Sequence, residues 1–184
     1  MPPENLDRTV AGARRGDEAA IADLYRALNP RLLRYLRHHA GPVAEDLASE
    51  VWLAIAPQLP DFDGGTSDLR ILMFTIARRR VVDHYRQKGR HEPALSFDDT
   101  FDCADTSDTE ALALAQVTAQ SAVDALVRRL PADQAEIVLL RVLGDLEVSE
   151  VAALVGKSNA AVRVAQHRAL LRLQRTWQRK DVTP

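Results

Sequence analysis

Cysteine, aromatic side chains and long apolar runs are all scarce in this sequence of 184 residues. The single cysteine, Cys103, excludes an internal disulfide and a CxxC metal motif. No stretch reaches the roughly 18–20 apolar residues that a membrane span requires. The first residues also lack the basic-then-apolar pattern of a secretory signal. We therefore expect a cytoplasmic protein that makes no membrane contact of its own.

The usual signatures of catalysis and metal binding are missing as well. The sequence contains neither a GxxxxGK[ST] phosphate loop nor a GxSxG nucleophile elbow. His38 and His39 are adjacent on a predicted helix and point in different directions, so we interpret them as interface residues rather than as ligands of one metal ion. We expect a protein that is not an enzyme, with no catalytic site, no metal site and no cofactor.

Charge is distributed unevenly along the chain, although the net charge is only −2. Residues 1–91 carry 14 Lys/Arg and 12 Asp/Glu, residues 92–127 carry 8 acids and no Lys/Arg, and residues 128–184 carry 10 bases and 6 acids. Six bases cluster at 78–90, and seven lie at 151–180, a stretch without any acid. Two basic helices separated by an acidic segment indicate an anionic partner such as nucleic acid.

Apolar residues repeat at helical spacing through most of the chain, and no run alternates as a strand would. The predicted helices begin after an Asp17 N-cap, at Pro30, and at about 43, 68, 110, 133, 148 and 159. Thr66 or Ser67 is the expected cap of the helix at 68–88, and glycines and prolines end the others. The sequence therefore predicts an all-α fold: two small helical domains, at 1–91 and 110–184, joined by a flexible acidic linker at 92–109.

The C-terminal segment has the spacing of a helix-turn-helix. A short helix at 148–155 would turn Val151, Ala152 and Leu154 inward, and Gly156 would allow the positive φ of the turn. The following helix has an apolar stripe formed by Val162, Ala165, Ala169, Leu170 and Leu173, with Gln166 at its edge. Its outer face would present Ser158, Asn159, Arg163, His167 and Arg168 to base edges in a major groove. A plain helical hairpin with a solvated basic face is the alternative.

The second basic segment is the predicted helix end at 76–90. Lys and Arg there would neutralise phosphates, and His84, Tyr85 and Gln87 are placed among them to grip unpaired bases. A solvated helix end, where basic residues favour the helix dipole, is the alternative.

Several short motifs, taken together and in order, resemble those of extracytoplasmic-function (ECF) sigma factors, group IV of the sigma-70 family. The first-helix start is GDEAA at 16–20, followed by AEDLASEVW at 44–52 and IARRRVVDHYR at 76–86. LPADQ at 130–134 resembles the opening of the family's second domain, and VAALVG at 151–156 with AVRVAQHRAL at 161–170 resembles its helix-turn-helix. The matches leave out little more than the linker and the tails.

The resemblance implies a role for each set of residues in promoter-specific transcription initiation. The first domain would dock on the β and β′ subunits of core RNA polymerase through Glu45, Asp46, Ser49, Glu50 and Trp52. The −10 element would be read and melted by Arg78, Arg79, Arg80, Asp83, His84, Tyr85, Arg86, Gln87, Lys88 and Arg90. The −35 element would be read by Lys157, Ser158, Asn159, Ala160, Arg163, Val164, Gln166, His167, Arg168 and Arg172.

The resemblance also implies partners and an oligomeric state. The free protein would be a monomer that binds promoter DNA poorly without polymerase, and an anti-sigma factor would hold it inactive. The linker would enter the polymerase channel, or it is a simple tether. Two other functions stay open: a stand-alone helix-turn-helix regulator, which would dimerise on palindromic DNA, and a helical interaction protein without a nucleic-acid role.

Overall fold

The computed structural model describes residues 3–87, 89 and 127–180, and the regular elements among these residues are helices, with no strand. The helices are α1 (Pro3–Arg14), α2 (Glu18–Ala40), α3 (Ala44–Ile55), α4 (Thr66–Gln87), α6 (Ala132–Val142), α7 (Val148–Val155) and α8 (Asn159–Lys180). Short 3₁₀ turns at Gly41–Val43 and Ala56–Gln58 flank α3. The predicted all-α class is confirmed. The predicted linker at 92–109 and the helix expected from 110 lie outside the described residues.

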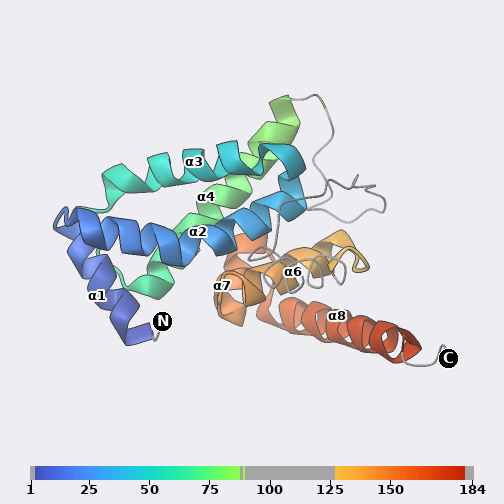
Figure 1. Ribbon diagram of the computed structural model, residues 1–184. Helices are drawn as coiled ribbons and strands as arrows, with labels where there is room; N and C mark the ends of the chain where they lie inside the picture. Colours follow the sequence, from blue (N-terminus) through green and yellow to red (C-terminus); the bar gives the residue numbers. More distant parts are fainter. Residues whose placement is uncertain (1–2, 88, 90–126, 181–184) are drawn as a thin grey trace.

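Helices α1 to α4 form an N-terminal unit around one apolar core (Figure 1). Its largest fully buried side chains include Leu24, Leu32 and Tyr35 from α2, Ile55 from α3 and Met73 from α4. Burying such an apolar side chain contributes about 1.5–3 kcal/mol, so packing between the helices stabilises this unit more than helix propensity does.

Helix α2 begins as predicted but runs further than predicted. The Asp17 side chain caps it by accepting hydrogen bonds from the backbone N–H groups of Ala19 (3.0 Å) and Ala20 (3.3 Å). The prediction that Pro30 starts a new helix is wrong, because Pro30 lies inside α2. Pro30 is exposed, while Leu28 and Leu32 on either side of it are fully buried. Burial of the helix face therefore offsets the roughly 3 kcal/mol that an internal proline costs.

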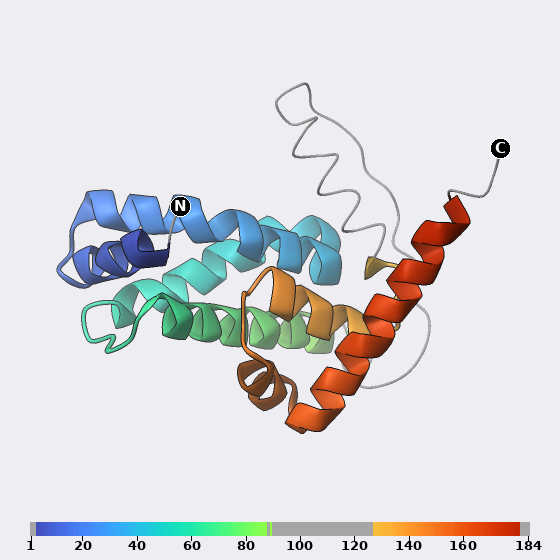
Figure 2. The same cartoon turned by 90° about the horizontal axis from the view of Figure 1, so that it is seen from below.

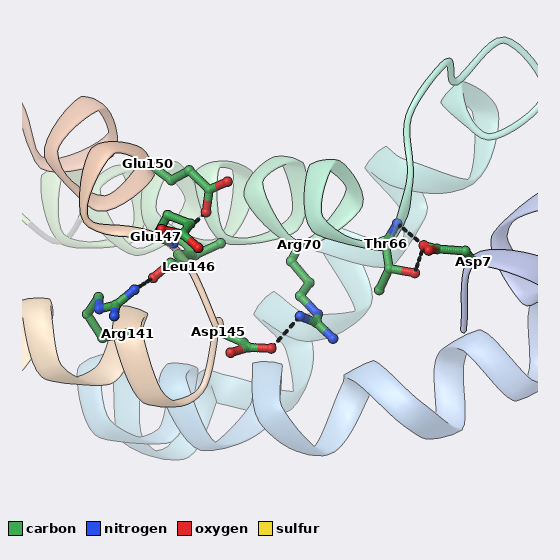
Figure 3. Close-up of polar contacts among 8 residues, drawn as sticks. All are labelled: Asp7, Thr66, Arg70, Arg141, Asp145, Leu146, Glu147 and Glu150. Atoms are coloured by element: carbon green, nitrogen blue, oxygen red, sulfur yellow. Dashed lines mark hydrogen bonds and ion pairs between the residues drawn. The ribbon is translucent and has the colours of Figure 1, made fainter. Parts of the chain in front are cut away.

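Helix α1 was not predicted, and it supplies the cap of another helix. Asp7 Oδ1 accepts hydrogen bonds from the Thr66 backbone N–H (2.8 Å) and from the Thr66 hydroxyl (2.5 Å), as Figure 3 shows. These bonds lower the pKa of the Asp7 carboxyl, the hydroxyl bond most strongly. The expectation that Thr66 or Ser67 caps α4 is therefore wrong, since α4 begins at Thr66 and a carboxylate 59 residues away satisfies its first N–H.

Helices α6 to α8 form a C-terminal unit that contains the predicted helix-turn-helix. The bounds of α7 match the prediction, and Gly156 ends it in the left-handed conformation with φ 69°. The Glu147 backbone N–H donates to Glu150 Oε2 (2.6 Å) across the first turn of α7. Val151 and Val162 are fully buried between α7 and α8.

One residue of the predicted apolar stripe lies outside the core. Val162 and Ala169 are buried and Ala165 and Leu173 are partly buried, whereas Leu170 is 52% exposed. At about 100° per residue, Leu170 lies about 80° around the helix from Val162, at the edge of the buried arc. The stripe is therefore narrower than predicted.

The two units pack directly against each other, as Figures 1 and 2 show. The rings of Tyr35 (α2) and Phe74 (α4) meet edge to face at 5.3 Å, and both side chains are fully buried. Gly144, in the loop after α6, lies against this pair so closely that a Cβ there would be 3.3 Å from the Phe74 ring and 2.5 Å from Leu140 O. A single apolar core therefore runs through both units.

Candidate nucleic-acid interface

The outer face of α8 carries exposed basic and polar side chains. Arg163 and Arg168 are both exposed, so neither is turned into the core. The Ser158 hydroxyl oxygen accepts a hydrogen bond from the Ala161 backbone N–H (3.2 Å), which caps the helix start. α8 therefore presents a cationic ridge that begins at a capped N-terminus.

Most of the other residues predicted to read the −35 element are exposed as well. The exposed ones are Ser158, Asn159, Ala160, Val164, His167 and Arg172. Lys157 and Gln166 are half-buried. Gln166 lies about 40° around the helix from Val162, so it sits at the border of the buried stripe.

The C-terminal half of α4 presents a smaller basic surface than the sequence indicates. Arg79, Arg86 and Gln87 are exposed, and Asp83 and His84 are half-buried. Arg80 Nε lies 3.4 Å from Glu50 Oε2 of α3, and Arg78 Nε lies 3.6 Å from Glu136 Oε1 of α6. Two arginines of the predicted −10 set therefore face carboxylates of the protein itself. Lys88 and Arg90 lie outside the described residues.

Tyr85 is not on the surface where the prediction placed it. Its side chain is buried, and its hydroxyl donates to the His39 backbone carbonyl at 2.7 Å, which joins the ends of α4 and α2. Its ring continues the stripe of Ala77 and Val81, so helical periodicity turns it inward. Stacking of Tyr85 on an unpaired base is thus inconsistent with its position in this structure.

The predicted polymerase-binding residues lie together on α3. Glu45, Asp46, Ser49 and Glu50 are exposed, and Trp52 is half-buried. The Trp52 indole N–H donates to Asn29 Oδ1 (3.0 Å), which fixes the ring against α2.

Exposed apolar side chains, which the sequence did not predict, extend this α3 surface. Leu53 is 75% exposed, and the Tyr25 ring, 47% exposed, lies 5.2 Å from the Trp52 ring. Ile21, one turn earlier on α2, is also exposed. One sequence signal could have revealed the exposure of Leu53. It falls outside the helical repeat of Leu47, Val51 and Ile55, the buried stripe of α3. Ile21, Tyr25, Trp52 and Leu53 are called the α2/α3 apolar patch below.

Among the described residues, no group of three or more His, Cys, Asp and Glu side chains could hold a metal ion. No helix in the same part of the chain is long and apolar enough to cross a membrane.

Acidification should destabilise the protein through His38, next to the junction of the two units. Burial, and secondarily the neighbouring His39, lower the pKa of His38 from 6.5 to about 4. The unfolded chain therefore binds this proton before the folded protein does, and the free energy of unfolding should fall from about pH 6.5 to about pH 4, by on the order of 3 kcal/mol at most. Thermal melts followed by circular dichroism at several pH values measure this loss.

The His38→Asn variant removes the titrating group and should flatten the melting temperature between pH 6.5 and 4. The pKa of Glu136 is lowered, since the attraction of His39 and Arg78 and the Tyr35 bond outweigh the effect of burial. The Glu136 contribution is thus fully present above its unfolded pKa of 4.5, and it is lost only as the pH falls below that value through the lower folded pKa. An identical pH dependence in wild type and His38→Asn would contradict the assignment to His38.

Comparison with known proteins identifies the family. Residues 24–91 match the model of Sigma-70 region 2, and residues 120–173 match that of Sigma-70 region 4. The chain is 36% identical over 182 residues to the ECF RNA polymerase sigma factor SigD of Mycobacterium tuberculosis (strain ATCC 25618 / H37Rv), covering 95% of this chain and 84% of SigD. It is 36% identical over 169 residues to ShbA of Streptomyces griseus, also an ECF RNA polymerase sigma factor, covering 86% of this chain and 88% of ShbA.

A solved structure supports the fold. CnrH, in complex with the cytosolic domain of CnrY, matches 94% of this chain with 97% of its own length at a TM-score of 0.60 and 21% identity. Each matched region ends in a basic helix, α4 in region 2 and α8 in region 4. The chain therefore belongs to the class of proteins that read promoters as initiation subunits of RNA polymerase. The chain is a member of the ECF group of the sigma-70 family of RNA polymerase sigma factors.

Proposed function

We propose that this chain directs core RNA polymerase to specific promoters by reading the −35 element with α8 and the −10 element with the end of α4. The observation that carries this proposal is the exposed cationic ridge of α8 within the region 4 match, together with a second basic helix within the region 2 match. The region 2 match also argues against a stand-alone helix-turn-helix regulator, which would have no use for that domain.

Helix α8 is suited to a major groove. Its N-terminal turn exposes Ser158 and Asn159, and Arg163 and Arg168 are exposed further along the helix. Arginine binds guanine through two hydrogen bonds, and contacts to phosphates fix the register without reading sequence. Arg163 and Arg168 are therefore proposed to specify bases, with Arg172 and Lys157 contributing phosphate contacts.

The end of α4 is proposed to bind the −10 element through Arg79, Arg86 and Gln87, the exposed members of the predicted set. Arginine attracts the phosphates of a separated strand, and a side-chain amide can hydrogen-bond to an unpaired base. His84 is half-buried and lies at the border of this surface. Tyr85 is buried, and its hydroxyl joins α4 to the end of α2 through its hydrogen bond to His39.

The α2/α3 apolar patch and the acidic side chains around it are proposed to bind core RNA polymerase. Exposed apolar side chains with a polar rim are typical of a protein interface, and aromatic residues are enriched at interface centres. Glu45, Asp46, Ser49 and Glu50 supply the rim, and Trp52 with Leu53 supplies the centre.

The protein is further proposed to act in the cytoplasm, as a monomer when free, without catalytic activity of its own. CnrH was solved with the cytosolic domain of another protein, CnrY. By analogy, an anti-sigma partner that covers the polymerase-binding or DNA-binding face is proposed here.

Run-off transcription with purified core RNA polymerase tests this function. Addition of the protein to core polymerase on genomic fragments should yield products with defined start sites, and polymerase or protein alone should yield none. A gel-shift assay with the same fragments should show specific binding only when polymerase is present. Tight binding of a dimer to palindromic DNA without polymerase would contradict the proposal.

A further inference from the structure

One buried polar side chain holds the indole ring of the α2/α3 apolar patch. Helices α2 and α3 run side by side (Figure 1), and the Trp52 N–H crosses between them to donate to Asn29 Oδ1 at 3.0 Å. Asn29 is only 9% exposed, whereas Trp52 is half-buried. An indole N–H can only donate, so the amide oxygen of Asn29 has to face it. The bond therefore restricts the orientation of both the amide and the ring.

Asn29 also continues the part of the patch that α2 provides. Ile21, Tyr25 and Asn29 are spaced four residues apart, so they form one row along the helix. The Tyr25 ring lies 5.2 Å from the Trp52 ring, with the two planes inclined at 47°. The indole therefore meets an exposed ring and a buried amide of the same row, and together they set its position between solvent and core.

An asparagine at this position is unfavourable for the helix itself. Asparagine has a lower helix propensity than leucine, and a buried amide is costly unless it is hydrogen-bonded. Pro30 follows directly inside α2. A proline disfavours the helical conformation of the residue before it, and it lacks the N–H that would bond to the Arg26 carbonyl. The bond to Trp52 accounts for the buried asparagine, because it satisfies the amide oxygen and ties α2 to α3 beside the proline.

The orientation of Trp52 matters because its ring belongs to the centre of the proposed interface. Tryptophan is among the residues that contribute most to binding energy at interface centres. A side chain that is already held in its binding position loses less conformational freedom when the partner arrives. Without the Asn29 oxygen, the N–H would be unpaired against α2, and the half-buried ring would turn it toward water instead.

We propose that Asn29 is a positioning residue of the polymerase-binding site, which holds the Trp52 indole in the orientation that core RNA polymerase binds. This inference rests on the proposed function of the α2/α3 apolar patch, whereas the hydrogen bond itself does not. Asn29 is buried, so it acts through Trp52 and not by touching the partner. Asn29→Leu keeps a similar volume but loses the acceptor, and it should weaken polymerase binding about tenfold, equivalent to about 1.4 kcal/mol.

Tryptophan fluorescence of the full chain tests the positioning without polymerase. The sequence has two tryptophans, so the Trp177→Phe background leaves Trp52 as the only one. In this background, Asn29→Leu should shift the emission to longer wavelength and increase quenching by acrylamide, because the ring turns toward water. The matched control is Leu36→Val, which shortens a fully buried side chain about 10 Å further along α2. The control should lower the melting temperature and leave quenching and polymerase binding unchanged.

Titration of labelled core polymerase with Asn29→Leu, Trp52→Phe and the double variant then tests the role in binding. A phenyl ring has no N–H, so Asn29→Leu should cause its tenfold loss with Trp52 present and little further loss in the Trp52→Phe background. Equal losses in the two backgrounds would mean that Asn29 acts through the fold, and they would overturn the proposal. Unchanged quenching of Trp52 would overturn it as well. Should Asn29→Leu fail to fold, Asn29→Ala removes the same acceptor without added bulk and is interpreted in the same way.

A Leu53→Asp variant, measured in the same titration, separates the failure of this inference from the failure of the proposed function. Weaker binding by Leu53→Asp together with wild-type binding by Asn29→Leu would keep the patch as the polymerase site and overturn the positioning role. Wild-type binding by both variants would overturn the proposed function of the patch and the positioning role with it. The fluorescence shift would then still demonstrate that Asn29 orients Trp52.

Discussion

Replacing Arg163 and Arg168 together with alanine is expected to reduce promoter-dependent transcription by about thirtyfold or more. Both side chains are exposed on α8, so their loss leaves the core intact. Each good arginine contact to a base contributes about 1–3 kcal/mol of discrimination, and 1.4 kcal/mol corresponds to a factor of ten. Two contacts of about 1 kcal/mol each already account for the stated loss. Run-off transcription at subsaturating promoter concentration measures it.

The control for this experiment is the double variant Arg8→Ala/Arg15→Ala. It removes the same charge from exposed positions in the N-terminal unit, outside every proposed site. We expect near-wild-type transcription from the control and wild-type polymerase binding from both variants. Equal losses in the two double variants would mean that bulk charge, and not the α8 surface, governs binding.

The Leu53→Asp variant is expected to weaken binding to core RNA polymerase by about thirtyfold or more. Leu53 is 75% exposed, and substitutions at such positions usually change stability by less than about 0.5 kcal/mol. A residue at the centre of an interface, by contrast, typically contributes about 2 kcal/mol or more. Titration of labelled core polymerase with the variant measures the change in affinity, and thermal melts verify the fold.

Ser67→Asp is the matched control for Leu53→Asp, because it adds the same charge at an exposed position in the first turn of α4. We expect this control to bind polymerase as the wild type does. Unaltered polymerase affinity in Leu53→Asp would remove the α2/α3 apolar patch from the proposed interface.

Local signals determined which elements could be predicted from the sequence. The bounds of α7 follow from a short apolar stripe and from Gly156, whose positive φ ends the helix. The Asp17 cap is likewise a local contact, between residues two or three positions apart. The continuous α2 could not be predicted, because the burial that offsets Pro30 depends on helices distant in sequence. The same holds for the Asp7 cap of α4.

In the candidate sites, too, some features follow from local sequence signals and others depend on the fold. The exposed positions of Arg163 and Arg168 follow from the helical period of α8 alone. The inward position of Tyr85 follows from its spacing with Ala77 and Val81. Its hydrogen bond to His39 and the ion pair of Arg78 with Glu136 require the fold, because these partners lie on other helices. Tyr35 and Glu136 are 101 residues apart in the chain, and no spacing rule connects them. Periodicity identified the exposed bases, but it could not show which of them face carboxylates of the protein.

We propose that two helices of one chain read two separate promoter elements in partnership with polymerase. Transcription of a randomised promoter library by core polymerase loaded with this protein, followed by sequencing of the transcribed templates, tests it most directly. We expect two enriched elements at a fixed spacing, with Arg163→Ala/Arg168→Ala relaxing the upstream element alone. Enrichment of a single palindrome, or relaxation of both elements together, would contradict the claim.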